Sequence, residues 1–182
     1  PYEIAQKEAE DRILKVTNLK KVFDNGFKAV DGVNIKMYED QIFVLLGHNG
    51  AGKTTTINML TGLFEQSHGS AELCGIDMFN DMDKVRQIMG VCPQHDILFE
   101  LMTTEEHLGI FYDLKGADPK LKKAEIEKLL KDVGLTDQRN KRAATLSGGN
   151  KRKLSVAIAM CGQSKFVLLD EPTSGLDLSA RR

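Results

Sequence analysis

The sequence lacks any long apolar run and any strong excess of one charge. Its longest apolar stretches, residues 42–46 and 156–161, are far shorter than the roughly 20 residues that a membrane-spanning helix needs. Lysine and arginine together number 25 and aspartate and glutamate 26, which leaves a net charge of -1. This balance supplies no broad electrostatic field for binding nucleic acid or an anionic bilayer. The chain is therefore not expected to cross a membrane by itself, and affinity for such partners has to be local.

Cysteine is also scarce, and its spacing does not suggest a metal site. Cys74, Cys92 and Cys161 are odd in number and far apart, and none belongs to a Cys-x-x-Cys pair. This pattern favours buried free thiols in a reducing compartment over a disulfide framework. The start of the chain lacks the apolar centre of a signal peptide. Because the chain begins with Pro1 rather than Met, we expect it to be cut from a longer protein, with residues 1–11 as a linker.

What the sequence does contain is the composition and patterning of one folded α/β domain. It has 182 residues, of which 41% are hydrophobic and 28% charged, as in ordinary globular proteins. Strand-like and helix-like segments alternate, which is typical of a parallel sheet with helices packed on it. Strands are expected at residues 13–19, 42–46, 89–92 and 166–169, and a hairpin or edge element at 69–75. The strand at 42–46 is expected to be central and buried on both faces.

Helices are expected after the second strand and throughout the middle of the chain. The first runs from Lys53 to residue 60. Thr103 and Glu106 form a capping box that opens a second helix ending near Gly116. Asp118, followed by a proline, predicts the start of a third helix that ends near residue 133. A fourth follows residues 147–149, so that residues 96–163 form a helical insertion.

A glycine-rich loop between the predicted strand at 42–46 and the helix at Lys53 fits the phosphate-binding loop. Its glycines allow successive amide N–H groups to turn inward around phosphate oxygens, and the helix N-terminus adds partial positive charge. We expect Lys53 to reach the terminal phosphates and the Thr54 hydroxyl to ligate Mg²⁺, with Thr55 also at the nucleotide. The loop consists of Gly47, His48, Asn49, Gly50, Ala51, Gly52, Lys53 and Thr54.

Two carboxylates follow the last predicted strand, where a parallel sheet presents its ligands. Asp170 is expected to hold Mg²⁺, and Glu171 to polarise the water that attacks the γ-phosphate. A third candidate is the helix start at Ser147, Gly148 and Gly149. It resembles an anion-binding N-terminus, but taken by itself this sequence favours a simple N-cap. The basic residues 151–153 that follow are interpreted as a solvated helix face.

The motifs and their order along the chain resemble the nucleotide-binding domain of ATP-binding-cassette (ABC) transporters. These motifs are the phosphate loop, Gln94, Leu-Ser-Gly-Gly at 146–149, Asp170-Glu171 and Ser-Gly-Leu-Asp at 174–177. The resemblance covers about residues 12–182. The residues in and around these motifs resemble those of the A subfamily in particular, whose members are associated mainly with lipids. It implies a P-loop NTPase core of RecA type at 12–95 and 164–182, interrupted by an α-helical subdomain at 96–163 and incomplete at the C-terminus.

The resemblance also implies roles for individual residues. Phe23 matches the aromatic that stacks on adenine, although a core or hairpin phenylalanine stays an alternative. Gln94 would join Mg²⁺ and the attacking water to the helical subdomain. Ser147 and Gly149 would touch the γ-phosphate bound by a partner domain in a head-to-tail pair, and Asp177 would lie across that interface. The family's switch histidine lies beyond residue 182, so this chain alone is expected to be weakly active or inactive.

The function implied is that of an ATPase motor binding Mg-ATP on the cytoplasmic face of a membrane. Its partners would be a second nucleotide-binding domain and the transmembrane domains of a transporter, with no nucleic acid. The A-subfamily resemblance implies that the transporter moves lipids. Two other functions stay open at this point. One is an ATP-binding regulatory module with little hydrolysis, which Glu171 argues against. The other is a soluble family member acting on nucleic acid or the ribosome, which the near-neutral charge argues against.

Overall fold

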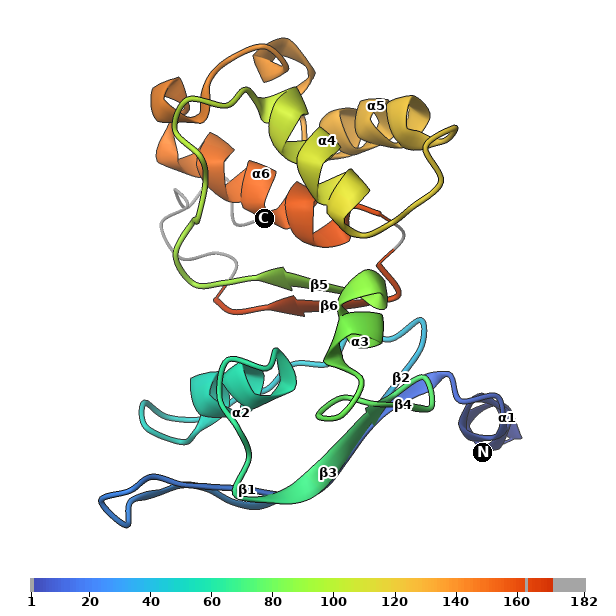
Figure 1. Ribbon diagram of the computed structural model, residues 1–182, viewed down its shortest axis with the longest axis vertical. Coiled ribbons are helices and arrows are strands. Elements are labelled where there is room, and N and C mark those ends of the chain that lie inside the picture. The colour runs from blue at the N-terminus through green and yellow to red at the C-terminus, as the bar shows by residue number, and fades with distance from the viewer. Residues whose placement is uncertain (1, 163, 172–182) are drawn as a thin grey trace. The chain divides into compact units, whose positions relative to one another are not determined.

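The computed structural model describes residues 2–162 and 164–171, and it divides into two compact units, residues 1–85 and residues 86–182. Figure 1 shows the elements of each unit. In the described part of the chain, no helix combines the length and the apolar character that crossing a membrane requires. The longest helix of these described residues has 13 residues.

The first unit is built on a four-stranded antiparallel sheet with the order β2-β1-β3-β4 (Figure 1). Its strands are β1 (Ile13–Val22), β2 (Lys28–Tyr38), β3 (His68–Leu73) and β4 (Ile76–Asp77). β1 lies in the interior of the sheet and pairs with β2 on one side and β3 on the other. The predicted strand at 13–19 is therefore present, and the hairpin or edge element predicted at 69–75 corresponds to the β3–β4 hairpin at one edge of the sheet.

A bulge in β1 changes which residues of the strand face the core. Leu14 and Val16 are buried in alternation, but Thr17 and Asn18 are both exposed before Leu19 is buried again. Asn18 has the positive φ of 48°, and its N–H donates to the Asn34 side-chain oxygen at 2.9 Å. One extra residue at this point keeps the apolar side chains on one face of the sheet.

Helix α2 (Lys53–Leu60) begins and ends where the sequence predicts, and it packs against β2. Helix α3 (Met82–Ile88) runs across the boundary between the two units. Residues 2–9, expected only as a linker, form helix α1 (Tyr2–Ala9), which also lies against β2.

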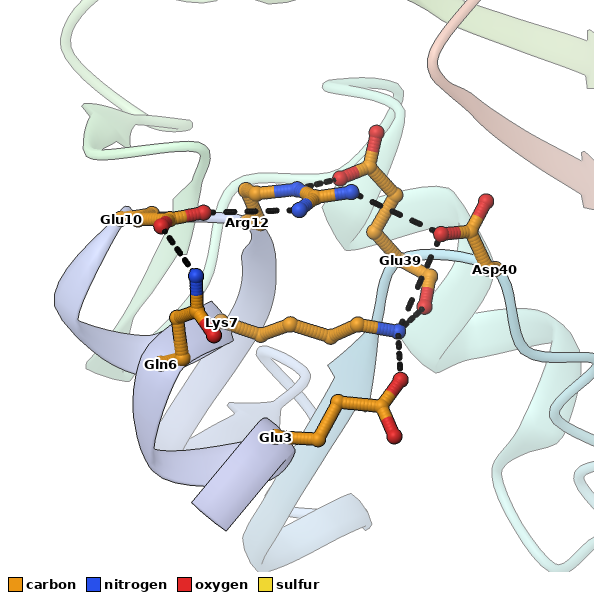
Figure 2. Close-up of polar contacts among 7 residues, drawn as sticks. All are labelled: Glu3, Gln6, Lys7, Glu10, Arg12, Glu39 and Asp40. Atoms are coloured by element: carbon orange, nitrogen blue, oxygen red, sulfur yellow. Dashed lines mark hydrogen bonds and ion pairs between the residues drawn. The ribbon is translucent and has the colours of Figure 1, made fainter.

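Polar contacts attach α1 to the end of β2, as Figure 2 shows. The Lys7 ammonium is largely buried and donates to the Glu39 carbonyl oxygen at 2.7 Å. It also forms ion pairs with Glu3 at 3.4 Å and Asp40 at 3.8 Å. Arg12 donates to the Glu39 carboxylate. Several acceptors around one buried lysine compensate for its desolvation, which keeps this short helix in place.

The prediction of a central strand at residues 42–46 is wrong. This segment has no strand assignment in the structure, and Ile42 and Leu46 are 96% and 85% exposed. A continuously apolar strand is stabilised by neighbours on both edges and both faces. The four strands of the first unit form an antiparallel sheet in which this segment takes no part. The apolar run indicates a tendency to be buried, but not which strands supply the partners.

The second unit contains the parallel pair β5 (Met89–Cys92) and β6 (Phe166–Leu169), in which Met89 is paired with Phe166 and Cys92 with Leu169. Both strands were predicted with these bounds. Helix α6 (Gly148–Met160) packs against both of them. A Cβ atom placed on Gly90 would lie 1.6 Å from the Ala159 carbonyl oxygen, so the close approach of α6 to β5 requires glycine there.

Helices α4 (Thr104–Leu114), α5 (Lys122–Asp132) and α6 lie between β5 and β6 in the chain and pack on one another. Two short 3₁₀ turns, η1 (Thr136–Gln138) and η2 (Ala143–Thr145), precede α6. The core of this helical group consists of Leu108, Tyr112, Ile126, Leu129, Leu130, Leu135, Leu146, Leu154, Ala157 and Cys161. The predicted helical insertion is present, and its limits at 96 and 163 stay a prediction.

The starts of these helices test the capping predictions. α4 begins with the complete capping box of Thr103 and Glu106. α5, however, begins at Lys122, so Asp118 is not its N-cap. The Asp118 carboxylate instead accepts the Lys120 N–H at 2.9 Å, which closes a separate turn ahead of the helix. An Asp-Pro pair favours a turn as readily as a helix start, which explains this difference.

Candidate functional site

The predicted phosphate loop is present as a curled segment that leads into α2. Gly50 and Gly52 have φ values of 84° and 85°, in the region that favours glycine. A Cβ on Gly52 would lie 2.3 Å from the Ala29 carbonyl oxygen, so this position admits no side chain. The Ala51 N–H donates to the His48 carbonyl at 3.1 Å and closes the curl.

The Lys53 side chain folds back into this loop. Its ammonium donates to the Gly47 carbonyl at 2.6 Å and to the His48 carbonyl at 3.1 Å. Gly52, the N-cap of α2, has no side chain that could satisfy the first N–H groups of the helix. The loop therefore gathers an ammonium group and the positive end of a helix dipole, which together suit a multiply charged anion such as a phosphate.

The hydroxyl groups of the first turn of α2 are used differently. Thr56 is buried, and its hydroxyl donates to the Gly52 carbonyl at 2.9 Å. Thr54 is exposed and Thr55 half-buried at the same end of the helix. The exposure of Thr54 fits the metal-binding role expected from the sequence. Thr56, whose hydroxyl bonds to the helix backbone, has a structural role.

Phe23 lies at the tip of the β1–β2 hairpin in a cluster of three phenylalanines. Its ring stacks on Phe27 with centroids 6.5 Å apart and meets Phe64 edge to face at 5.9 Å. The Lys21 ammonium lies 5.3 Å from the centroid of the Phe23 ring. The hairpin role is therefore present, and stacking of adenine on this half-buried ring stays a prediction.

In the second unit, the ends of β5 and β6 bring together two of the predicted catalytic side chains. The Gln94 amide donates to the Glu171 carboxylate at 3.0 Å. The Asp170 N–H donates to the Cys92 carbonyl at 2.9 Å, which continues the ladder one step beyond the strands. Glu171 then turns away with a φ of 46°, unusual for a residue other than glycine. Its exposed carboxylate follows directly after the parallel pair of strands.

Arg152 corrects the interpretation of residues 151–153 as a solvated face. Lys153 is exposed, but Arg152 is 3% exposed and its guanidinium reaches the segments that carry Gln94 and Glu171. Its partners are the carbonyl oxygens of Pro93, Gln94, Asp170 and Glu171 and the carboxylate of Asp96. The helical period is the sequence signal that could have revealed this burial, because Arg152 lies on the same face of α6 as the buried Ser155 and Ala159.

Ser147 is the N-cap of α6, and its hydroxyl accepts the Asn150 N–H at 3.3 Å. Gly148 and Gly149 form the first turn, and an added Cβ on Gly148 would meet no atom within 4 Å. The simple capping role is therefore present, and contact with a partner's γ-phosphate stays a prediction. Asp177 lies outside the described residues.

The three cysteines are free thiols, as expected. Burial raises the pKa of the Cys92 thiol and raises that of Cys161 to about 11. Cys74 is half-buried. Among the described residues, no group of three or more His, Cys, Asp or Glu side chains could hold a metal ion.

Comparison with known proteins decides the family, because the family model described as "ABC transporter" matches residues 30–174. The chain belongs to the ABC transporter family. The matched range contains the phosphate loop, Gln94, the 147–149 turn and the Asp170-Glu171 pair, but neither Phe23 nor Asp177.

Relatives of the A subfamily are similar over almost the whole chain. Human "Phospholipid-transporting ATPase ABCA3" is 48% identical over 99% of this chain and 11% of the relative. Human "Retinal-specific phospholipid-transporting ATPase ABCA4" is 51% identical over 92% of this chain and 7% of the relative. The chain thus spans about a tenth or less of the length of these relatives.

A solved structure, "Structure of ATP binding subunit of ABC transporter", is similar with a TM-score of 0.85. It is 27% identical in sequence, and the match covers 93% of this chain and 70% of that one. The fold is therefore the P-loop NTPase fold of the ABC family, with an inserted helical subdomain, as the sequence predicts.

Proposed function

We propose that this domain binds Mg-ATP and hydrolyses it to power the movement of a phospholipid across a membrane. The observation that carries the proposal is the phosphate loop, in which the Lys53 ammonium lies against the carbonyls of Gly47 and His48 at the start of α2. The positive φ angles of Gly50 and Gly52 define the curled shape of this loop. Preformed donors lower the cost of binding a charged group.

The residues divide the chemistry among them. Lys53 would contact the terminal phosphates as charge develops on them. Glu171 would orient and polarise the attacking water, and Gln94, hydrogen-bonded to Glu171, would hold that carboxylate in one orientation. Bound Mg²⁺ would supply charge neutralisation at the β- and γ-phosphate oxygens.

The metal ligands expected from the sequence suit Mg²⁺ by their chemistry. Thr54, Gln94 and Asp170 each offer an oxygen, and they contribute one carboxylate between them. Mg²⁺ is commonly held by one or two carboxylates together with substrate phosphates and water, rather than by a full protein cage.

The remaining proposals concern the assembly. The names of the relatives describe phospholipid-transporting ATPases, and we propose the same substrate class here. A second nucleotide-binding domain would close on this one, with Ser147 and Gly149 of each facing the γ-phosphate of the other. Transmembrane domains would receive the movement, and this domain would lie on the cytoplasmic face of a membrane.

The test is calorimetric titration of Mg-ATP into the full-length protein that contains this domain. Wild-type protein is expected to bind, and Lys53→Ala and Gly52→Ala to lose at least about tenfold in affinity because a phosphate contact or the loop conformation is removed. Lys128→Ala, an exposed lysine on α5, is the matched control and is expected to bind as wild type does. Absence of Mg-ATP binding by folded wild-type protein would contradict the proposal.

A further inference from the structure

A single buried guanidinium joins the two loops that carry Gln94 and Glu171. Arg152 lies on α6, between β5 and β6 in the chain. Its Nη1 donates to the carbonyls of Pro93 at 2.5 Å and Gln94 at 3.3 Å. Its Nη2 donates to the carbonyls of Asp170 at 2.9 Å and Glu171 at 3.0 Å. Each terminal nitrogen of the fork therefore holds the main chain of one loop.

Burial of this charge is compensated locally. The Arg152 side chain is 3% exposed, and its Nη1 forms an ion pair with Asp96 at 3.2 Å. A buried cation without partners would be very costly, whereas one with a carboxylate and four carbonyl acceptors is satisfied. Five hydrogen-bond acceptors from two loops surround this one side chain. A residue that only capped the helix or kept it soluble would not need so many partners. The arrangement fixes the geometry of the loops themselves.

We infer that Arg152 is a positioning residue for ATP hydrolysis, which holds the backbone at 93–94 and 170–171 so that the Gln94 and Glu171 side chains meet. This inference rests on the proposed function. Besides the ion pair with Asp96, the contacts described above are to main-chain carbonyls, which include those of Gln94 and Glu171 but neither of their side chains, so Arg152 acts through these two residues. Gln94 and Glu171 are 77 positions apart in sequence, and their hydrogen bond depends on the relative placement of the two loops.

Shape as well as charge matters at this position. The planar fork of arginine offers two nitrogens with fixed directions, while lysine offers one ammonium on a flexible stem. A lysine here could keep the ion pair with Asp96 but could not hold both loops. Arg152→Lys is therefore expected to retain charge and lose part of the positioning.

The experiment measures kcat, KM and Mg-ATP affinity in the full-length protein. Arg152→Met is expected to lower kcat by about 10- to 100-fold, the cost of misplacing catalytic groups by an ångström or less, with affinity for Mg-ATP changed by less than about threefold. Arg152→Lys is expected to fall between this variant and wild type. Lys153→Met, the exposed neighbour on the same helix, is the matched control and is expected to keep wild-type kcat.

A double-mutant cycle with Glu171→Gln separates positioning from a structural role. If Arg152 acts through Glu171, Arg152→Met should lower the residual rate of Glu171→Gln by less than about twofold. An equal loss in both backgrounds, or a kcat of Arg152→Met close to wild type, would overturn the inference. Should Arg152→Met fail to fold, Arg152→Lys carries the same cycle. Absence of Mg-ATP turnover in the wild type contradicts the proposed function instead, so the two failures are distinguishable.

Discussion

The side-chain amide of Gln94 donates a 3.0 Å hydrogen bond to the carboxylate of Glu171. One residue follows β5 and the other follows β6, so the contact forms where the two parallel strands end. An amide is a neutral donor that can orient a carboxylate without neutralising it. The pair therefore supplies a negatively charged group with a defined direction, which is what activation of a water molecule requires.

The first prediction concerns this pair. Glu171→Gln should lower kcat for ATP hydrolysis by about 10²- to 10⁴-fold, because the general base is lost, and should leave Mg-ATP binding intact. Gln94→Ala should lower kcat less, by about tenfold, because the base remains but is less well oriented. Phosphate release by the full-length protein measures both. Glu127→Gln, at an exposed glutamate of α5, is the control, and wild-type turnover in Glu171→Gln would contradict the assignment.

The second prediction concerns the packing of α6 on β5. Gly90→Ala would bring a Cβ within 1.6 Å of the Ala159 carbonyl oxygen, so backbone must move, and the free energy of unfolding should fall by about 3 kcal/mol. Gly109→Ala in α4 meets only the Lys122 side chain at 3.5 Å, and it should raise stability by about 0.5–1 kcal/mol through helix propensity. Denaturant unfolding compares them, and equal effects of the two substitutions would contradict this account.

The third prediction concerns the capping box of α4. Thr103→Ala removes the acceptor for the Glu106 N–H and should lower the free energy of unfolding by about 1 kcal/mol. The Thr103 backbone N–H, which donates to the Glu106 carboxylate at 2.7 Å, holds the pKa of that carboxyl below its usual value.

A lowered pKa in the folded state fixes the direction of the pH effect. The contribution of Glu106 is fully present above the ordinary glutamate pKa of about 4.3 and is lost as pH falls through the lowered value. The difference in Tm between wild type and Glu106→Ala should therefore be constant near neutral pH and shrink below about pH 4. A difference that grows toward low pH would contradict the capping role.

The fourth prediction concerns the thiols. Burial raises the pKa of Cys161 to about 11 and also raises that of Cys92, so both are short of the reactive thiolate and shielded from reagents. Iodoacetamide at pH 8 should label Cys74, which is half-buried, at least about tenfold faster than either. Mass spectrometry of the native protein measures the rates, with unfolded protein as the control in which all three should label alike. Fast native labelling of Cys161 would contradict its burial.

Sequence reasoning succeeded where the determinants are local. The start of α2 at Lys53 follows from glycines that allow a positive φ, and the start of α4 follows from Thr103 and Glu106, three residues apart. β5 and β6 are short apolar runs ended by Pro93 and by Asp170. In each case the residues that decide the structure are neighbours in the chain.

It failed where the determinant is a partner far along the chain. Residues 42–46 have the composition of a buried strand, yet burial needs strands beside it that the run itself does not encode. Arg152 lies between two lysines and has the same local charge pattern as a solvated surface. Its burial is decided by Asp96 and by carbonyls of two distant loops. β2 was not predicted either, because Asp31 and Gly32 interrupt its apolar pattern and its pairing with β1 defines it.

The parallel pairing of β5 with β6 has a consequence for the order of events on the ribosome. Met89 of β5 can pair with Phe166 of β6 only after α4, α5 and α6, which lie between them in the chain, have been synthesised. At about 5–20 residues per second, the first strand emerges roughly 4–15 s before its partner exists. During that interval the glycine-rich loop at residues 47–54 is already present in the nascent chain, whereas Glu171 is not. On the proposed function, a chain that stalls in this interval has the loop proposed to bind the nucleotide and lacks the carboxylate proposed to activate water.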